Sequence, residues 1–281
     1  MIDPSARRAT WHYPERFIPM KWIKRIGIFF GGLYLLLCLL LYVFQDSLIF
    51  HPRALAAEHS YGNYEESWIE LEDGDRLHAL RLRDEPAEGV ILYLHGNVGN
   101  NGRSLYQTKS IRGLGYDLFL VDYRGFGKSE GVIDDENDMT SDLQAVYDAL
   151  KQEYAEGNIF IAGYSLGSGP ASYLAANNSP GGVLLVSPYT SLVDMKNRFF
   201  WMFPDFLLKY SLDNAANLAA SNCPVIIVHG TDDELIPLDM GKGLSRIDPT
   251  RISLLELDGV GHRGAILNTA IKEAMNKLLK R

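Results

Sequence analysis

The chain has 281 residues, 47% of them hydrophobic, and a formal net charge of −8 at pH 7. This length suits one α/β domain with an attached segment, because such domains commonly reach about 200 to 250 residues. The acidic balance argues against a general nucleic-acid binder. The cysteines Cys38 and Cys223 indicate neither a disulfide framework nor a zinc site.

Residues 26–44 form an uncharged run rich in Leu, Phe and Tyr. As a helix it would span about 28 Å, close to the roughly 30 Å hydrocarbon core of a bilayer. A buried core helix and a cleaved signal peptide are the alternatives. The length of the run, its lack of a polar face and the absence of a small-residue cleavage site favour an uncleaved membrane anchor.

Basic residues concentrate before this run, which predicts its orientation. Residues 1–25 are expected to be a short basic tail, and the residues just after the run carry few positive charges. The positive-inside rule places the N-terminus in the cytoplasm and the catalytic part on the extracytoplasmic side, periplasmic or lumenal. Residues 45–66 are expected to be a connecting segment.

Strand and helix patterns alternate through residues 67–281. Residues 67–71 and 76–82 alternate apolar and polar positions, which predicts a hairpin with one solvated face. Near-continuous apolar runs predict strands buried on both faces of a mostly parallel sheet, at residues 90–94, 118–121, 159–162, 183–186, 225–228 and 252–257. Helical stretches separate them, at residues 103–114, 138–154, 166–177, 238–247 and 265–279. The sequence therefore predicts an α/β fold with helices on both faces of the sheet.

Residues 192–222 interrupt this alternation with two helix-like pieces. We interpret them as a small lid whose apolar face covers the substrate pocket or touches lipid, and ordinary core is the alternative. The expected substrate-binding residues are the aromatic ones, Phe199, Phe200, Trp201 and Phe203.

The strand at 159–162 is followed by Gly163-Tyr164-Ser165-Leu166-Gly167 and then by a helix-compatible stretch. A strand, a Gly-x-Ser-x-Gly turn and a helix form a nucleophile elbow, in which glycines allow a tight turn that lifts the serine hydroxyl out of the sheet. The motif also occurs by chance, so a base, an acid and an oxyanion hole must accompany it.

A serine hydroxyl needs an imidazole to accept its proton and a carboxylate to orient that imidazole. His262 lies in a glycine-rich loop between the last strand and the last helix, after the serine in the chain, and is the expected base. His95 and His229 each end a strand and are interpreted as structural. Three carboxylates in the loop after residues 225–230 compete for the acid, namely Asp232, Asp233 and Glu234.

These motifs together resemble the α/β-hydrolase superfamily, in which the order is serine, acid, histidine. Members with the pattern His-Gly-x-x-Asp-x-x-x-Pro use the aspartate four residues before the proline, and counting back from Pro237 implies Asp233, with Asp232 as the runner-up. The stretch His95-Gly96-Asn97 is similar to the oxyanion loop of the superfamily. The resemblance implies an oxyanion hole made by the backbone N–H groups of Asn97 and Leu166.

More narrowly, residues 44–281 resemble membrane-anchored hydrolases of the abhydrolase-domain-containing group, the twelve, thirteen and seventeen types, and their bacterial relatives. The matching stretches are residues 44–52, 95–100, 122–129 and 163–167. The group includes lysophospholipases, protein thioesterases and broad esterases. The N-terminus lacks the cysteine cluster of the seventeen type, which argues against protein deacylation at the cytoplasmic face.

We therefore expect a serine hydrolase that cleaves carboxylic esters or thioesters through an acyl-serine on Ser165. It would act on lipid-like substrates, without a metal or an organic cofactor. A serine peptidase that uses the same residues is the first alternative, and a non-catalytic membrane scaffold is the second.

Overall fold

The computed structural model describes residues 20–280, so most of the predicted tail lies outside the described residues. The chain divides into two units, Met1–Val43 and Phe44–Arg281. Helix α1, Met20–Ile49, contains the whole predicted anchor and extends beyond it at both ends. Among the described residues, α1 alone is long and apolar enough to cross a membrane. The helix ends shortly before Pro52, whose ring and missing N–H disfavour its continuation.

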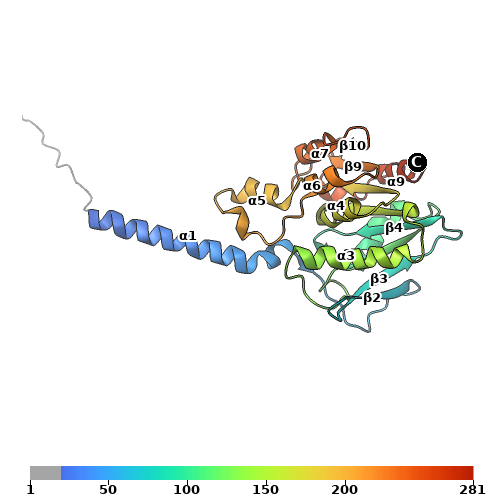
Figure 1. The fold of residues 1–281 in the computed structure, drawn as a ribbon, viewed down its shortest axis with the longest axis horizontal. Helices are drawn as coiled ribbons and strands as arrows, with labels where there is room; N and C mark the ends of the chain where they lie inside the picture. The colour runs from blue at the N-terminus through green and yellow to red at the C-terminus, as the bar shows by residue number, and fades with distance from the viewer. Residues whose placement is uncertain (1–19, 281) are drawn as a thin grey trace, which may run out of the picture. The chain divides into compact units, whose positions relative to one another are not determined.

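The second unit is built on an eight-stranded sheet in the order β10-β9-β8-β7-β4-β6-β3-β2 (Figure 1). Its strands are β2 (Glu65–Glu70), β3 (Arg76–Leu82), β4 (Gly89–Leu94), β6 (Tyr116–Val121), β7 (Ile159–Tyr164), β8 (Gly182–Val186), β9 (Val225–Gly230) and β10 (Ile252–Leu257). Strand β3 pairs antiparallel with β2 and β6, whereas all other neighbours in this sheet are parallel. The predicted hairpin and the mostly parallel sheet are thus confirmed.

One detail of the strand prediction is wrong. Residues 252–257 were expected to be buried on both faces, but Leu255 of β10 is 38% exposed. The reason is topological, because β10 is an edge strand whose partner in the sheet is β9.

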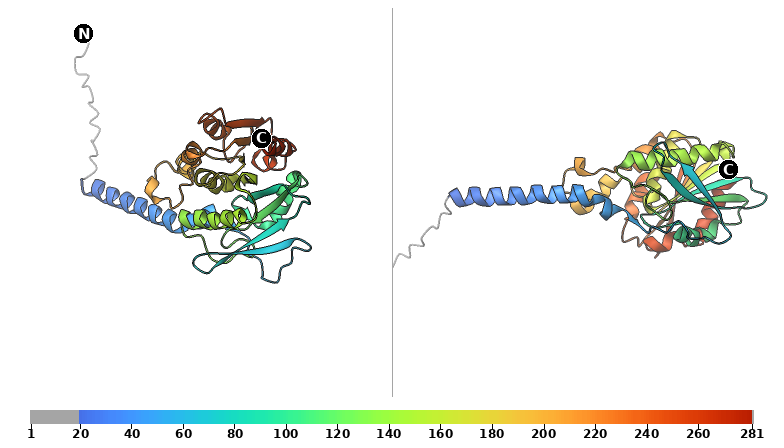
Figure 2. Two further views of the ribbon diagram at one scale, coloured as in Figure 1. Left: turned by 45° about the vertical axis from the view of Figure 1, so that its right-hand side comes forward. Right: turned by 90° about the horizontal axis from the view of Figure 1, so that it is seen from below.

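Alternate residues of the central strands serve two separate cores. Leu92 and Leu94 of β4 pack with helices on one face, and Ile91 and Tyr93 pack with helices on the other. The first face is covered by α3 (Glu136–Lys151), α4 (Ser168–Asn177), α6 (Asn214–Ala220) and α7 (Leu238–Ser245). The second is covered by α2 (Asn101–Gln107), the 3-10 turn Thr108–Ile111, α8 (His262–Ala265) and α9 (Ala270–Leu279). Figure 2 shows helices on both sides of the strands.

The segment at 45–66 is more than a connection. Strand β1, His51–Pro52, pairs in parallel with β5, Val98–Gly99, in a separate two-stranded sheet. The N–H of His51 donates to the carbonyl of Asn97 at 2.8 Å, and the Asn97 amide donates to the carbonyl of Ile49 at 2.8 Å. The residues that follow the apolar run therefore brace the loop after β4.

Residues 192–222 contain α5 (Leu192–Phe200), a 3-10 turn (Asp205–Leu207) and α6. Part of this segment is core, since Tyr210 and Leu218 are fully buried. Its aromatic part is not, because Trp201 is 75% and Phe206 is 82% exposed. The core interpretation therefore fails for the aromatic residues at the end of α5.

Candidate active site

Ser165 sits at a strained turn between β7 and α4. Its φ of 52° lies in the left-handed region, which a non-glycine residue occupies at a cost that is typical of functional sites. The glycines on either side leave no room for a side chain. A Cβ on Gly163 would lie 2.5 Å from the carbonyl oxygen of Gly167. A Cβ on Gly167 would lie 2.1 Å from the carbonyl oxygen of Leu94. The turn thus has the geometry of a nucleophile elbow.

The structure brings Ser165, His262 and Asp233 into one hydrogen-bonded chain. His262 Nε2 lies 3.0 Å from Ser165 Oγ, and His262 Nδ1 lies 2.8 Å from Asp233 Oδ2. All three side chains are buried. The residues follow the carboxyl ends of β7, β10 and β9, which meet at one edge of a parallel sheet where ligands bind in open α/β folds.

Asp233 is held as an anion by its surroundings. Its Oδ1 accepts hydrogen bonds from the N–H groups of Leu235, at 3.0 Å, and Ile236, at 2.8 Å. Burial by itself would raise the pKa of Asp233, but hydrogen bonds from His262 and the Ile236 N–H hold it below its ordinary value. The runner-up, Asp232, is exposed, and its Oδ1 accepts a hydrogen bond from the Thr231 hydroxyl.

Neighbouring groups fix the position of His262. The Tyr164 hydroxyl donates to its carbonyl at 3.3 Å, and its own N–H donates to Glu234 Oε2 at 3.3 Å. His229 lies beneath the site, with Nε2 at 2.8 Å from the Ile236 carbonyl and 3.5 Å from Asp233 Oδ2. His229 is fully buried, and burial lowers its pKa, so a neutral ring supports the acid loop.

The predicted oxyanion donors also lie beside the serine. Leu166 follows Ser165 within the 3-10 turn Ser165–Gly167, and Asn97 lines the same cavity as Ser165. A Cβ on Gly96 would come within 3.3 Å of the Tyr164 ring, so the loop runs close over the end of β7. Both residues thus lie near Ser165, and the role of their backbone N–H groups as oxyanion donors stays a prediction.

The cavity at Ser165 has a volume of about 230 Å³. Its lining contains polar and charged residues that the sequence prediction did not include, namely Arg103, Gln107 and Arg263. The other lining residues are Gly96, Asn97, Val98, Tyr164, Ser165, Leu235 and His262. In the sequence, the position of Arg263 directly after the predicted base His262 was the only indication that Arg263 belongs to the site.

The structure does not place Phe199, Phe200, Trp201 or Phe203 in this lining, contrary to the expectation of an acyl pocket. Residues 192–222 are instead hydrogen-bonded to Gln45. The Gln45 amide donates to the Leu207 carbonyl at 3.0 Å, and the Lys209 N–H donates back to Gln45 Oε1 at 2.8 Å. The segment is thus fastened to residues that directly follow the apolar run of α1.

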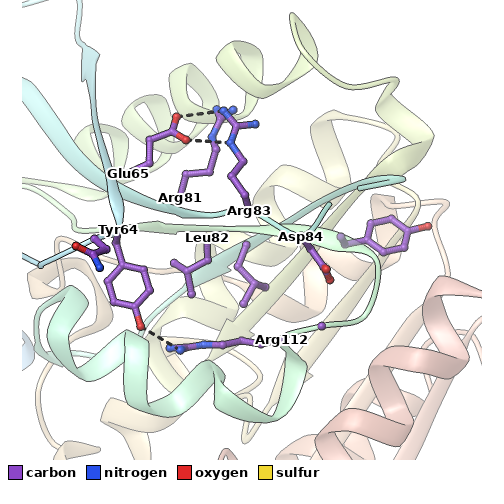
Figure 3. Close-up of a pocket in the computed structure, with 11 residues that line it drawn as sticks. Tyr64, Glu65, Arg81, Leu82, Arg83, Asp84 and Arg112 are labelled. Atoms are coloured by element: carbon purple, nitrogen blue, oxygen red, sulfur yellow. Dashed lines mark hydrogen bonds and ion pairs between the residues drawn. The ribbon is translucent and has the colours of Figure 1, made fainter. Parts of the chain in front are cut away.

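A second cavity, of about 470 Å³, lies at the opposite end of the strands, where β6 begins (Figure 3). Its arginines have partners, because Arg83 pairs with Glu65 at 2.9 Å and Arg112 donates to the Tyr64 hydroxyl at 3.3 Å. None of its lining residues is a histidine, serine or cysteine, so it has no counterpart of the serine–histidine pair at Ser165. Among residues 20–280, no group of three or more His, Cys, Asp or Glu could hold a metal ion.

Comparisons with known proteins show which families and structures the chain is similar to. Residues 85–211 match the family described as serine aminopeptidase, S33. Lysophosphatidylserine lipase ABHD12 of Danio rerio is 34% identical over 178 residues, which cover 55% of this chain and 46% of that protein. ABHD12 of Mus musculus is 33% identical over 179 residues, which cover 56% and 45%. The chain thus spans about half the length of the relatives that it matches.

Solved structures share the fold. The Pyrococcus furiosus esterase Pf2001 has a TM-score of 0.65 at 19% identity, covering 83% of this chain and 97% of that one. Est1E of Butyrivibrio proteoclasticus has a TM-score of 0.63 at 18% identity, covering 77% and 99%.

The sheet order, the serine elbow and these structures define the class of fold, and the chain has the α/β-hydrolase fold, as the sequence predicted. Among proteins with this fold, the chain is similar to ABHD12 over about half of its length.

Proposed function

We propose that the protein is a serine hydrolase that cleaves carboxylic ester or thioester bonds. The observation that carries this proposal is the position of His262, whose two ring nitrogens contact Ser165 Oγ and Asp233 Oδ2. The names of similar proteins, a lysophosphatidylserine lipase and esterases, support ester substrates.

In this mechanism Ser165 Oγ attacks the carbonyl carbon while His262 Nε2 takes the hydroxyl proton. Asp233 orients the ring and stabilises its positive charge. The N–H groups of Asn97 and Leu166 bind the oxyanion, and each such donor contributes about 3 to 4 kcal/mol at the transition state. His262 then gives the proton to the leaving oxygen or sulfur, and water hydrolyses the acyl-serine by the same route.

A serine aminopeptidase is the alternative, because the matched family carries that description. Binding the free amine of a peptide substrate calls for a carboxylate near the nucleophile. The lining of the Ser165 cavity contains two arginines and neither Asp nor Glu, so its charge favours esters over amines.

The test is a substrate panel of acyl esters, acyl thioesters and aminoacyl anilides, run with the wild type and with Ser165→Ala. We expect turnover of esters or thioesters and labelling by a fluorophosphonate, both lost in Ser165→Ala. Preferential turnover of anilides would support the peptidase, and a folded wild-type protein that resists the label would support the scaffold.

We also propose that residues 26–44 cross a membrane, with the N-terminus in the cytoplasm and the hydrolase unit on the other side. Basic residues before the run and few after it support this orientation, since they include Arg16, Lys21, Lys24 and Arg25. A periplasmic phosphatase reporter fused after Arg281 should be active. Activity of a cytoplasmic reporter at that position would reverse the orientation.

The aromatic part of residues 192–222 is proposed to touch the same membrane. Gln45 and Asp46 are the first polar residues after the apolar run, so they lie at the lipid–water boundary when the run is in a bilayer. Leu207 and Tyr210 are hydrogen-bonded to Gln45 and Asp46, at 3.0 and 2.8 Å, and so lie at this level. We call the exposed side chains of this segment the apolar patch, consisting of Phe199, Phe200, Trp201, Met202 and Phe206. Aromatic side chains are favoured at this boundary.

A further inference from the structure

We propose that residues 49–53, at the end of α1 and in β1, position the backbone N–H of Asn97 for the oxyanion of the reaction. We call residues 49–53 the bracing segment. This inference rests on the proposed ester hydrolysis and adds positioning residues that lie outside the lining of the cavity at Ser165. Asn97 belongs to the loop 95–100, which connects β4 to α2.

Asn97 bonds the bracing segment through both its main chain and its side chain. Its carbonyl accepts the N–H of His51 at 2.8 Å, and its side-chain amide donates to the carbonyl of Ile49 at 2.8 Å. Within residues 20–280 the structure gives the backbone N–H of Asn97 no hydrogen bond. The bracing segment therefore holds Asn97 at two points and leaves unbonded the one group that the mechanism requires.

The middle of the loop makes its other hydrogen bonds to the same segment. The N–H of Arg53 donates to the carbonyl of Gly99 at 3.0 Å, beside the parallel pairing of β1 with β5. Within the described part of the chain, every hydrogen bond of residues 97–99 is made with the bracing segment.

The two ends of the loop are held by other groups. The Tyr123 hydroxyl donates to the carbonyl of His95 at 2.7 Å, and the Asn100 side chain caps α2 by accepting the N–H of Gly102 at 3.0 Å. Loss of a bond to the bracing segment would therefore displace Asn97 while both ends of the loop stay in place.

The bracing segment is itself fixed to the hydrolase unit. Phe50 is buried in the core, with its ring centroid 5.0 Å from that of Tyr210. The N–H of Gly127 donates to the carbonyl of Arg53 at 3.3 Å, and the N–H of Leu55 donates to the carbonyl of Gly127 at 2.6 Å. A segment held on both sides in this way can keep a loop in one position.

The position of an oxyanion donor has a large effect on rate. A donor acts when it lies about 3 Å from the oxygen that gains charge, and removal of one donor lowers turnover about 10²- to 10³-fold. Displacement of a group by about 1 Å can cost up to about 10²-fold. We expect loss of one bond between Asn97 and the bracing segment to cost about tenfold, because the N–H itself remains.

The test uses the full chain in neutral detergent, with two variants that each remove one bond. Asn97→Ala removes the amide that bonds Ile49 and keeps the backbone N–H. His51→Pro removes the N–H that bonds the carbonyl of Asn97, in an extended strand that is compatible with proline. Active sites are counted by complete reaction with a fluorophosphonate, and kcat/KM for para-nitrophenyl hexanoate is expressed per counted site.

Pentyl trifluoromethyl ketone gives a second readout. Ser165 Oγ adds to its carbonyl carbon while His262 takes the hydroxyl proton, so the ketone oxygen becomes an anion in the oxyanion hole. In both variants kcat/KM per site should fall about tenfold, and the inhibition constant of the ketone should rise by a similar factor. A role in folding alone would lower the number of counted sites and leave both quantities unchanged.

Two control variants match these changes. His51→Ala keeps the backbone N–H and removes only an exposed side chain, so both quantities should stay at the wild-type values. Asn158→Ala also removes an amide that donates to a distant carbonyl, that of Glu88 at 3.0 Å, but Asn158 precedes β7 at the end remote from Ser165. It should leave both quantities unchanged.

The outcomes separate this inference from the proposed function. If the wild type hydrolyses the ester and Asn97→Ala keeps its kcat/KM per site and its inhibition constant, positioning is wrong and ester hydrolysis stands. Equal losses in Asn158→Ala would also refute positioning. If the wild type neither hydrolyses the ester nor reacts with the fluorophosphonate, the proposed function itself has failed. If His51→Pro does not fold, Asn97→Ala decides alone.

Discussion

Asp122 Oδ1 lies 3.5 Å from His95 Nε2, with both side chains buried beneath the loop that carries Asn97. Burial raises the pKa of Asp122 to about 8 and lowers that of His95 to about 4. Both groups are therefore neutral at pH 7. His95 Nδ1 lies 2.6 Å from the Gly96 carbonyl, so that nitrogen carries the proton and Nε2 faces the protonated carboxyl as an acceptor.

This pair predicts a pH-dependent stability. The pKa of Asp122 is about 8 in the fold and near 4 in the unfolded chain, so its contribution is fully present below about pH 4 and is lost as pH rises through 8. Its share of the unfolding free energy falls by at most about 1.4 kcal/mol per pH unit. Asp122→Asn should therefore stabilise the protein at pH 8 and do so progressively less toward pH 4.

Thermal or urea unfolding at several pH values measures this difference. Asp134→Asn removes an exposed carboxylate and serves as the control. A stability change in Asp122→Asn that is the same at every pH would show that Asp122 is ionised in the folded protein.

The choice of acid gives a second prediction. Asp233→Asn should leave the fold intact but lower kcat about 10⁴-fold, because an amide at that position favours the wrong tautomer of His262. Asp232→Asn should change kcat by far less, since Asp232 is exposed and His262 bonds Asp233. Turnover of a soluble ester measures both variants. If Asp232→Asn lost activity and Asp233→Asn kept it, Asp232 and not Asp233 would be the acid.

The elbow gives a third prediction. A Cβ on Gly167 would lie 2.1 Å from a backbone oxygen of Leu94, and backbone in the central strand cannot move aside cheaply. Gly167→Ala should destabilise the protein by about 3 kcal/mol. Gly157→Ala is the control, because its Cβ would meet nothing within 4 Å, and it should stay within about 0.5 kcal/mol of the wild type. Equal midpoints of unfolding would contradict the steric argument.

Much of the fold could be predicted, and so could the positions of Ser165 and His262, because each depends on a local sequence pattern. Apolar runs mark the strands, and the glycines around Ser165 and His262 mark turns that few other residues tolerate. The identity of Asp233 needed the superfamily resemblance, because three neighbouring carboxylates have the same chemistry and periodicity does not separate them.

The rest depends on contacts between distant segments. The pairing of His51 with Val98 involves two-residue strands, which are too short to show any periodicity. Arg103 looks like an ordinary surface residue until the fold places it in the cavity at Ser165. The aromatic run of α5 was expected to line an acyl pocket, but the lining of the Ser165 cavity does not include it, because apolar composition alone does not tell where a side chain lies.

The last prediction concerns this apolar patch, and Trp201 allows a direct measurement. In bilayers that contain brominated phospholipids, a tryptophan that contacts lipid is quenched. Trp201→Phe should reduce the part of the tryptophan fluorescence that brominated lipid quenches. Trp68→Phe, on strand β2, should reduce only the part that is not quenched. Phe206→Asp should lower the ratio of turnover of a bilayer-embedded ester to that of a water-soluble ester, since a charge opposes burial of the patch in lipid. Unquenched Trp201 emission together with an unchanged ratio would show that the patch does not contact the membrane.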